Sequence, residues 1–187
     1  MTRTNASPPD GDPYQVPAFS LKNRMARALW GLVYVFLFRP SPRIFFGWRN
    51  FLLRLFGAKI GSKCCIYSKA EIWAPWNLVC SEVVAVADGA VIYNPSLVTL
   101  GSHTIVSQHA YICGATHDPD DANFPLISKP VIIGSYSWVC ARSTVMPGVV
   151  LGEGSVLALG AVATKNIEDW AIYGGVPAKK LRNRVRN

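Results

Sequence analysis

The feature that most constrains the fold is a six-residue period that runs from Ile60 to Thr164. An aliphatic residue tends to recur at every sixth position, with a small residue two places before it. The register is most regular late in the chain, where the aliphatic and small positions are Ile133, Val139, Val145, Leu151 and Leu157, and Ser137, Ser143, Val149, Ser155 and Ala161. Repeats of this length are typical of a parallel β-helix.

The period has a simple physical explanation. Alternate side chains of a strand point the same way, so the small and the aliphatic residue both face inward and the remaining residues turn a corner. Three such units make one triangular coil, and stacked coils bury a continuous apolar column. An ordinary β-sandwich with regular turns would not explain small residues at one fixed phase.

Interruptions of the period predict where the coils are irregular. The steps from Leu78 to Val86 and from Ile92 to Leu100 are eight residues long, which predicts a two-residue insertion at a corner. The step of 21 residues from Ile112 to Ile133 contains the most polar stretch, 118–130. A loop ejected from a regular coil is often functional.

Charge is concentrated at the two ends of this chain, whose formal net charge is +8. Residues 1–59 hold nine Lys/Arg against two acids, and 179–187 hold five Lys/Arg and no acid, whereas 60–178 is mildly acidic. A basic stripe with stacking aromatics, expected of a nucleic-acid binder, is missing from the repeat, so nucleic acid is not an expected partner.

The regions outside the repeat have distinct characters. Residues 1–20 are predicted to be a mobile tail, because 1–19 are rich in Pro, Asp, Ser and Asn. Residues 21–56 are predicted to form two helices, the second with Ile44, Phe45, Trp48, Phe51, Leu52 and Leu55 on one stripe and Arg43, Arg49 and Arg54 available for the other face. These helices would pack on the first coils, where they cover an open end of the β-helix, or on a neighbouring subunit. They could also rest on an anionic membrane surface, and the two possibilities are compatible.

Histidine and cysteine positions narrow the chemistry. His103 and His109 fall at corners of successive units, hence at different corners of the prism, where one metal ion could not easily bind both. His117 falls at an outward position beside the ejected loop, where its imidazole can reach a substrate, and the unperturbed pKa of an imidazole lies near neutrality. Asp118 is a candidate for fixing its tautomer. The five cysteines show no spacing typical of a metal site and are expected to be reduced.

Several motifs together resemble the hexapeptide-repeat acyltransferases. They are His117-Asp118, Ser137-Trp138-Val139, Pro147-Gly148-Val149, Leu159-Gly160-Ala161, Thr164-Lys165 and the closing run Gly174 to Lys179. The resemblance covers about residues 57–182 and is strongest to the maltose, galactoside and nodulation-factor O-acetyltransferase branch, in particular to exopolysaccharide enzymes of the colanic acid type. It implies an all-β fold, a left-handed β-helix over 57–178 followed by a basic tail over 179–187. It also implies a homotrimer with active sites in the clefts between neighbouring prisms.

The resemblance also implies a mechanism. His117 would act as general base toward a sugar hydroxyl that attacks the thioester of acetyl-CoA. Backbone amides of Cys140 and Ala141 would stabilise the oxyanion, and Asn94 matches an asparagine that contacts the acceptor. The positions matched to the donor are Trp138 at the thiol end, Leu159 and Gly160 along the pantetheine arm, and Thr164, Lys165, Lys179 and Arg182 at the nucleotide end. Arg184 and Arg186 are expected to be solvated, and no metal is expected.

Departures and alternatives remain open at this point. The long apolar and basic segment 21–56 differs from the shorter N-terminus of family members with soluble acceptors, which favours a polymeric or lipid-linked glycan. It is compatible with a cytoplasmic protein that contacts the inner face of the cell membrane. The alternatives are a metal-dependent hydratase of the carbonic anhydrase kind, a non-catalytic β-helix scaffold, and a cysteine nucleophile, for which no partner base is placed.

Overall fold

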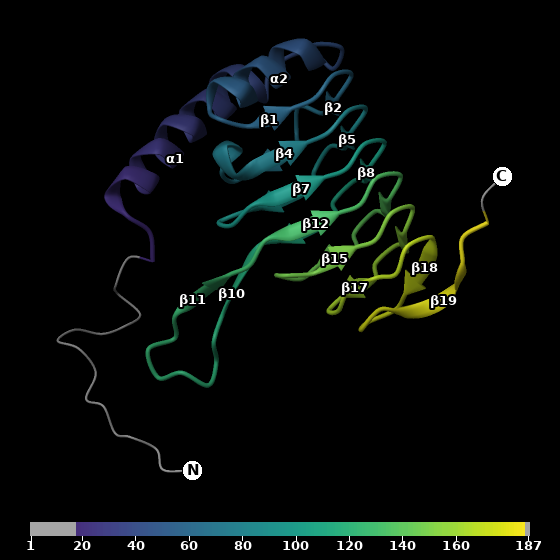
Figure 1. The fold of residues 1–187 in the computed structure, drawn as a ribbon. Coiled ribbons are helices and arrows are strands. Elements are labelled where there is room, and N and C mark those ends of the chain that lie inside the picture. Colours follow the sequence, from purple (N-terminus) through teal and green to yellow (C-terminus); the bar gives the residue numbers. More distant parts are fainter. Residues whose placement is uncertain (1–17, 186–187) are drawn as a thin grey trace.

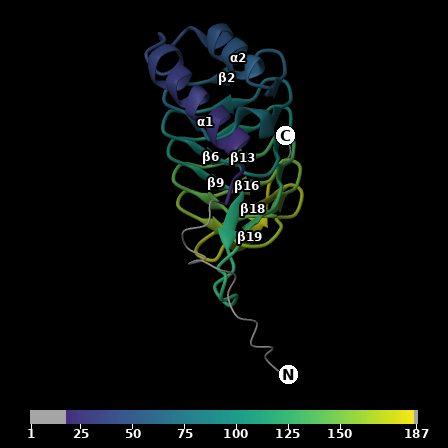
Figure 2. The same ribbon diagram turned by 90° about the vertical axis from the view of Figure 1, so that its left-hand side faces the viewer.

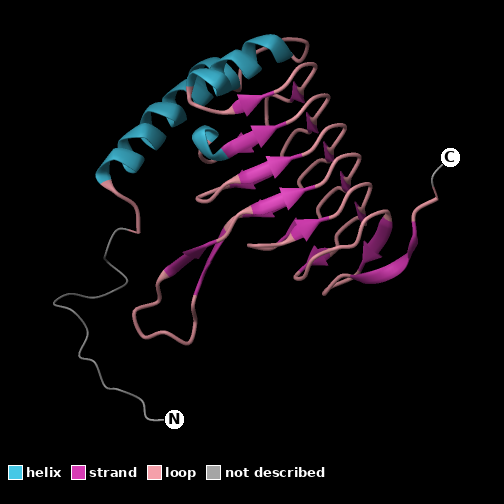
Figure 3. Cartoon of the chain, viewed as in Figure 1, coloured by secondary structure: helices cyan, strands magenta, loops and turns pink. Residues whose placement is uncertain are grey.

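The structure is a computed structural model of the 187-residue chain, in which residues 18–185 are described. Most of the tail expected over residues 1–20 therefore lies outside the described residues. Two helices lie at one end of a stack of triangular coils, and an antiparallel strand lies at the other end (Figures 1 and 3).

Three sheets form the sides of the stack, which is a parallel β-helix, and all their strands are parallel except the last one, β19. Sheet A contains β1 Lys59–Ile60, β4 Leu78–Cys80, β7 Val98–Leu100, β12 Val131–Ile133 and β15 Val150–Leu151. Sheet B contains β2 Cys65–Ile66, β5 Ala85–Val86, β8 Ile105–Val106, β13 Trp138–Val139, β16 Val156–Leu157, β18 Ala171–Gly174 and β19 Lys179–Asn183. Sheet C contains β3 Glu71–Ile72, β6 Val91–Tyr93, β9 Tyr111–Cys113, β14 Thr144–Val145 and β17 Val162–Ala163.

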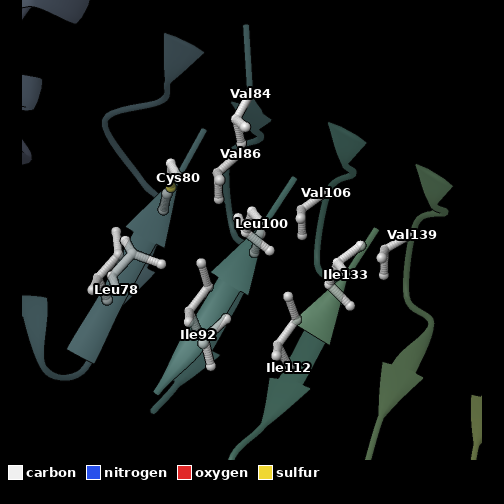
Figure 4. Packing of buried hydrophobic residues seen from close by; sticks show 14 of the residues in the cluster. Leu78, Cys80, Val84, Val86, Ile92, Leu100, Val106, Ile112, Ile133 and Val139 are labelled. Carbon is white, nitrogen blue, oxygen red and sulfur yellow. The ribbon is translucent and has the colours of Figure 1, made fainter. Parts of the chain in front are cut away.

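The inward positions of successive coils stack directly on one another, as the period predicts. Strand pairing aligns Cys80 with Leu100, Val86 with Val106, and Ile92 with Ile112. These side chains are buried and form one apolar column (Figure 4). The small positions are buried as well, including Ser137, Ser143 and Ser155, whose hydroxyls bond to neighbouring coils or to their own corner.

The first expected insertion lies one unit earlier than the sequence predicts. Cys80, rather than Leu78, pairs with Ile60 and Leu100 at the aliphatic position, so the eight-residue step runs from Ile72 to Cys80. A 3₁₀ turn, η3 Pro75–Asn77, takes up the extra residues. Leu78 and Cys80 are both buried inward residues of β4, which is why an apolar pattern alone does not distinguish them.

The N-terminal helices cover the first coils, but with a different face from the one expected. α1 spans Leu21–Val33, continues as a π-helical turn, η2 Tyr34–Phe38, and is followed by α2 Phe46–Leu55. In α2 the buried residues are Arg49, Asn50, Leu52 and Leu53, whereas most of the expected apolar stripe is exposed. The prediction that Arg49 lies on the outer face is therefore wrong.

The buried face of the helices is built on hydrogen bonds to the coils. Arg49 Nε donates to Ile66 O (2.6 Å), and its terminal nitrogens donate to Ser41 Oγ, Pro42 O and Arg43 O. Trp30 Nε1 donates to Ile72 O (2.7 Å). Carbonyls at the open end of a sheet need donors, and these side chains supply them.

The ejected loop is an ordered β-hairpin that projects from the stack (Figure 1). β10 Ala115–His117 pairs antiparallel with β11 Leu126–Ser128, so the excursion begins three residues earlier than the expected 118–130. It occupies the corner between sheets C and A, between β9 and β12. The polar stretch thus forms the tip of a hairpin that holds His117 away from the coils.

The basic C-terminal segment closes the far end of the stack. β19 pairs antiparallel with β18, so residues 179–183 form a strand where a tail was expected. Arg184, expected to be solvated, donates to Tyr136 O (2.8 Å) and Gly154 O (3.0 Å) and lies over the ring of Trp170. That expectation is wrong for Arg184, while Arg186 lies outside the described residues.

Candidate active site

His117 is an exposed residue at the end of β10, presented by the hairpin. Its imidazole lies nearly parallel to the ring of Phe124, with the ring centroids 4.4 Å apart. Pairing of Thr116 with Ile127 and of His117 with Leu126 fixes the backbone on both sides of the hairpin. The ring is therefore positioned by stacking and by strand pairing, and it stays accessible to a substrate.

One ring nitrogen of His117 is hydrogen-bonded to the backbone. His117 Nδ1 lies 2.8 Å from Phe124 O. A carbonyl oxygen can only accept, so Nδ1 carries the proton, and the neutral ring leaves Nε2 with its lone pair. Among residues 18–185, no hydrogen bond involves Nε2. This is the tautomer that a general base acting through Nε2 requires.

Asp118 does not fix the tautomer in this structure. Its Oδ1 accepts a hydrogen bond from Asp120 N (3.0 Å), and its own N–H donates to Pro125 O (3.2 Å). Aspartate commonly makes such local bonds in turns. The carbonyl of Phe124 takes the place expected of Asp118, and the carboxylate shapes the hairpin tip.

Cys140 and Ala141 lie at the corner between sheets B and C, after β13. The Cys140 N–H donates to Leu157 O of the next coil (3.0 Å), so this N–H is not available to a substrate. The Ala141 N–H makes no hydrogen bond within the described part of the chain. Of the two expected oxyanion donors, the structure leaves only Ala141 with an available N–H.

The turn at this corner has a defined type. Ser143 N donates to Cys140 O (3.2 Å), and Arg142, at the third position, has φ of 58°. A positive φ at that position with this hydrogen bond describes a type II turn. Ala141 is its second residue, and its N–H points away from the turn's own hydrogen bond.

The other expected donor-binding residues occupy two regions. Leu159 and Gly160 lie at the same sheet B–C corner, one coil beyond Ala141, where Leu159 is 74% exposed and a side chain at Gly160 would meet open space. Trp138 lies on sheet B, half-exposed, and donates to Ser107 Oγ (2.8 Å).

The four residues expected at the nucleotide end are exposed. Thr164 and Lys165 follow β17 at the sheet C–A corner, and Lys179 and Arg182 belong to β19. The neighbouring Lys180 is paired with Glu168 (2.6 Å), which lowers the pKa of that carboxyl by hydrogen bonding. Within residues 18–185, Lys165, Lys179 and Arg182 form no ion pair with an acidic side chain.

The expected site divides between two edges of sheet C. His117 lies at the C–A edge, whereas Ala141, Leu159 and Gly160 lie at the B–C edge. Equivalent positions on the two edges are six residues apart, or up to about 20 Å at ~3.3 Å per residue. Within one prism, the expected base and the expected oxyanion donor therefore lie at different corners.

Asn94, expected to contact the acceptor, is fully buried. Its Oδ1 accepts from Ala74 N (2.9 Å), and its Nδ2 donates to Ala74 O (2.8 Å). These bonds hold two coils together at the insertion before β4. An acceptor contact stays a prediction, and it would require the amide to exchange one of these bonds.

The remaining histidines and cysteines lie apart from His117. His103 and His109 take left-handed corner conformations, with φ of 59° and 57°, at the A–B and B–C corners respectively. Within residues 18–185, no three His, Cys, Asp or Glu side chains converge in a way that could hold a metal ion. Burial raises the pKa of the Cys140 thiol, which disfavours the thiolate that a nucleophile needs.

Two features of the site region were not predicted. The first is Phe124, whose carbonyl and ring both hold His117; only the paired geometry of the hairpin identifies it. The second is a recess of about 300 Å³ between α1 and sheet C. Its lining includes the aromatic residues Trp30, Tyr34, Trp73, Tyr93 and Tyr111, with Arg27 stacked on Trp73. Outward aromatics on three successive strands were the available signal.

Two sequence relatives match nearly the whole chain, and a third matches about half of it. The chain is 34% identical over 173 residues to the putative colanic acid biosynthesis acetyltransferase WcaF of Escherichia coli K12, which covers 92% of this chain and 95% of WcaF. The Shigella flexneri protein of the same name matches equally. A probable acetyltransferase of Mycobacterium tuberculosis is 34% identical over 92 residues, covering 46% of this chain and 31% of its own length.

Solved structures share the fold. A hexapeptide-repeat acetyltransferase from Vibrio cholerae, solved with acetyl coenzyme A, has a TM-score of 0.82 at 20% identity and covers 92% of this chain and 94% of its own. A maltose O-acetyltransferase from Clostridium difficile 630 has a TM-score of 0.81 at 19% identity, covering 89% and 90% of the two chains.

These likenesses define the architecture and the family. The coils are those of a left-handed parallel β-helix with an N-terminal helical segment. No protein-family model matches the chain. Because a third of its residues are identical along nearly the whole length of both chains, the protein belongs to the hexapeptide-repeat acetyltransferases, in the family of the putative colanic acid biosynthesis acetyltransferase WcaF.

Proposed function

We propose that the protein transfers an acetyl group from acetyl-CoA to a hydroxyl of an exopolysaccharide glycan or its lipid-linked precursor. The observation that carries the mechanism is the bond between His117 Nδ1 and Phe124 O (2.8 Å), which leaves Nε2 as a proton acceptor on an exposed hairpin. The relative in Escherichia coli is named a putative colanic acid biosynthesis acetyltransferase, which supports an exopolysaccharide acceptor. The acetyl-CoA bound by the Vibrio cholerae neighbour supports the donor.

The chain's residues supply three functions in this reaction. His117 Nε2 takes the proton from the acceptor hydroxyl while that oxygen forms its bond to the thioester carbon. The Ala141 N–H donates to the oxyanion of the tetrahedral intermediate. As the carbon–sulfur bond breaks, His117 returns the proton to the departing sulfur, so the enzyme ends in its starting state.

The division of the site between two edges favours an oligomer. We propose a homotrimer in which the C–A edge of one prism faces the B–C edge of the next, so that His117 of one subunit meets Ala141 of its neighbour. The exposed side chain of Leu159 and the open space at Gly160 would line the same cleft, and Thr164, Lys165, Lys179 and Arg182 would hold the phosphates. Closed rings generated by one repeated contact are common among homo-oligomers.

The aromatic recess beside sheet C is a candidate for acceptor binding. Its lining combines aromatic faces with the hydroxyls of Tyr93 and Tyr111 and the carboxylate of Glu71, a combination that suits a sugar ring. Tyr111 lies on β9, the strand that leads into the His117 hairpin. We also propose a cytoplasmic location, because the five cysteines are all unpaired, which suits a reducing compartment.

The first prediction concerns His117 itself. His117→Ala should lower the rate of acceptor-dependent CoA release by about two to four orders of magnitude, because the base is lost. Asp118→Asn should change it by no more than roughly threefold, since an amide oxygen can accept from Asp120 N as the carboxylate does. Free thiol release from acetyl-CoA, measured with a panel of glycan acceptors, gives both values.

His103→Asn is the matched control, because asparagine tolerates the left-handed corner conformation of His103. It should keep wild-type activity. Undiminished transfer by the His117→Ala variant would remove His117 from the mechanism.

A further inference from the structure

The N-terminal helices α1, η2 and α2, called the helical cap here, have two apolar faces. Only one of these faces packs on the coils. The inner face is fixed by hydrogen bonds from Trp30, Arg49 and Asn50 to Ile72 O, Ile66 O and Cys64 O. Rotating either helix to bury its other face would break these bonds. The second apolar face therefore remains exposed in the folded chain.

We name this second face the outer helical surface. Its members are 40–79% exposed and come from α1, η2, α2 and the segment between η2 and α2: Leu21, Met25, Leu29, Leu32, Val35, Phe36, Leu37, Ile44, Phe45, Trp48, Phe51 and Leu55. Together they expose on the order of 1,000 Å² of apolar area, compared with about 300–600 Å² for the largest patch of a typical monomer.

The outer helical surface is continuous across both helices. Trp48 Nε1 donates to Leu37 O (3.0 Å), and the Trp48 ring stacks on Phe51 at 5.9 Å. A recess of about 330 Å³ lies between Phe36, Leu37, Phe45 and Trp48. Along α1, the stripe from Leu21 to Phe36 extends for about 22 Å at 1.5 Å per residue.

Basic residues border this surface. Residues 18–59 contain eight Lys/Arg and no Asp/Glu. At 100° per residue, Lys22 and Arg24 lie on opposite sides of the α1 stripe. Arg39 is exposed directly after η2. Arg43 and Arg54 are also exposed, but they are held by the coils, since Arg43 lies over the Tyr67 ring and Arg54 donates to Ile60 O (2.8 Å). Long basic side chains at such borders can extend toward charged groups while their stems stay on apolar area.

The exposed apolar area and its basic border together favour one kind of binding partner. A second copy of the same surface would bring two strongly basic segments together, which costs free energy. An anionic lipid interface supplies both an apolar layer for the stripe and negative headgroups for the border. No helix in residues 18–185 is long and apolar enough to cross a membrane. We propose that the outer helical surface docks the enzyme flat on an anionic lipid interface.

The position of α1 relates lipid docking to the hairpin that carries His117. α1 and the β10–β11 hairpin project on the same side of the coil stack in both views (Figures 1 and 2). Docking through α1 would therefore turn the hairpin that carries His117 toward the lipid. A glycan attached to a lipid would reach the site in that orientation.

The test measures co-sedimentation of the full chain with vesicles. One set contains phosphatidylcholine with roughly 30% phosphatidylserine, the other phosphatidylcholine alone. Wild type should bind the anionic vesicles at least about fivefold better, and high salt should reduce this preference. Leu29→Gln/Leu32→Gln/Phe36→Gln should lose binding by about tenfold or more, since glutamine keeps helix propensity and removes apolar area.

Two further variants separate the contribution of the basic residues to vesicle binding from a general effect of exposed leucines. Lys22→Gln/Arg24→Gln/Arg39→Gln should abolish the preference for anionic vesicles. The matched control, Leu97→Gln/Leu181→Gln, removes exposed leucines outside the cap and should bind as wild type. Circular dichroism and native mass, measured without lipid, show that each variant keeps its fold and assembly.

Two results would overturn the proposal. One is equal binding by wild type and the triple apolar variant. The other is a native mass that falls in the triple apolar variant, which would show that a second copy covers the surface. The assay uses neither acetyl-CoA nor acceptor, so its failure would leave the proposed acetyl transfer untouched.

Discussion

Ala141 offers a test of the oxyanion contact at the scale of one backbone group. It is the second residue of a type II turn, where proline is favoured, and its N–H makes no hydrogen bond within residues 18–185. The chain already has Pro147-Gly148 at the corresponding places of the next corner. Ala141→Pro should therefore keep the fold and lower kcat by about 10²–10³, because one oxyanion donor is lost.

The control for this substitution is Ser68→Pro, at the second position of the turn at the same corner in the first coil, where Ala70 N donates to Tyr67 O (3.1 Å). Lys69, its third residue, does not have the positive φ of Arg142, but proline is favoured at the second position of type I and type II turns alike. It should leave kcat unchanged. Steady-state kinetics of both variants, with circular dichroism for the fold, decide the point. If Ala141→Pro folds and keeps full activity, the oxyanion is stabilised elsewhere.

Arg49 shows how a single residue can anchor an element. Its guanidinium is fully buried, donates to four acceptors, and lies 4.9 Å from the centroid of the Phe46 ring. Burial lowers the pKa of this group, although an arginine stays charged at any ordinary pH. A lysine carries the same charge but lacks the planar fork that reaches several carbonyls at once.

We predict that Arg49→Lys lowers the free energy of unfolding by about 3 kcal/mol, because buried carbonyls lose their donors. That corresponds to a decrease in Tm of roughly 6–12 °C for a chain of this size. Thermal unfolding at a fixed protein concentration measures it, with Arg39→Lys, at an exposed residue, as the unchanged control. A Tm within about 2 °C of wild type would mean that the anchor contributes little.

Among the elements, the coils and the presence of two N-terminal helices could be predicted from sequence, but the buried face of the helices could not. Strand alternation alone assigns a side to each residue, so Val86, Val106 and Val139 were predicted inward and are buried. The helices instead carry apolar residues on both faces. Which face is buried depends on carbonyls such as Ile66 O, which only the folded coil presents to Arg49.

The C-terminal strand is a second element whose role depends on tertiary contacts. Arg184 reaches two corner carbonyls of earlier coils, at the A–B corner where His103 stacks on Tyr136 at 4.8 Å. Arg184→Ala should lower the free energy of unfolding by about 2 kcal/mol, as expected for hydrogen bonds from a charged donor. Thermal unfolding measures the difference, with Arg182→Ala as the control, since the Arg182 side chain donates to the adjacent Asn183 O and reaches no corner carbonyl within residues 18–185. Equal Tm values would show that β19 adds no stability through Arg184.

At the scale of the whole molecule, the sequence predicts which residues belong to the proposed site but does not predict where they lie relative to one another. The family motifs identify His117, Leu159 and Gly160 by position. Only the stacking of the coils shows that His117 lies at one edge of sheet C and the others lie at the opposite edge. The tautomer of His117 likewise depends on Phe124 O, a backbone atom seven residues away that no side-chain pattern marks.

The central claim, a site shared between subunits, is tested most directly by mixing two inactive chains. His117→Ala and Ala141→Pro subunits, each with its own tag, are co-expressed, and assemblies that carry both tags are isolated. In a closed trimer of two kinds of subunit, one of three clefts receives both intact edges. We therefore predict recovery of about one third of wild-type acetyl transfer. Mixed assemblies as inactive as either parent would contradict a shared site and place the reaction within one subunit.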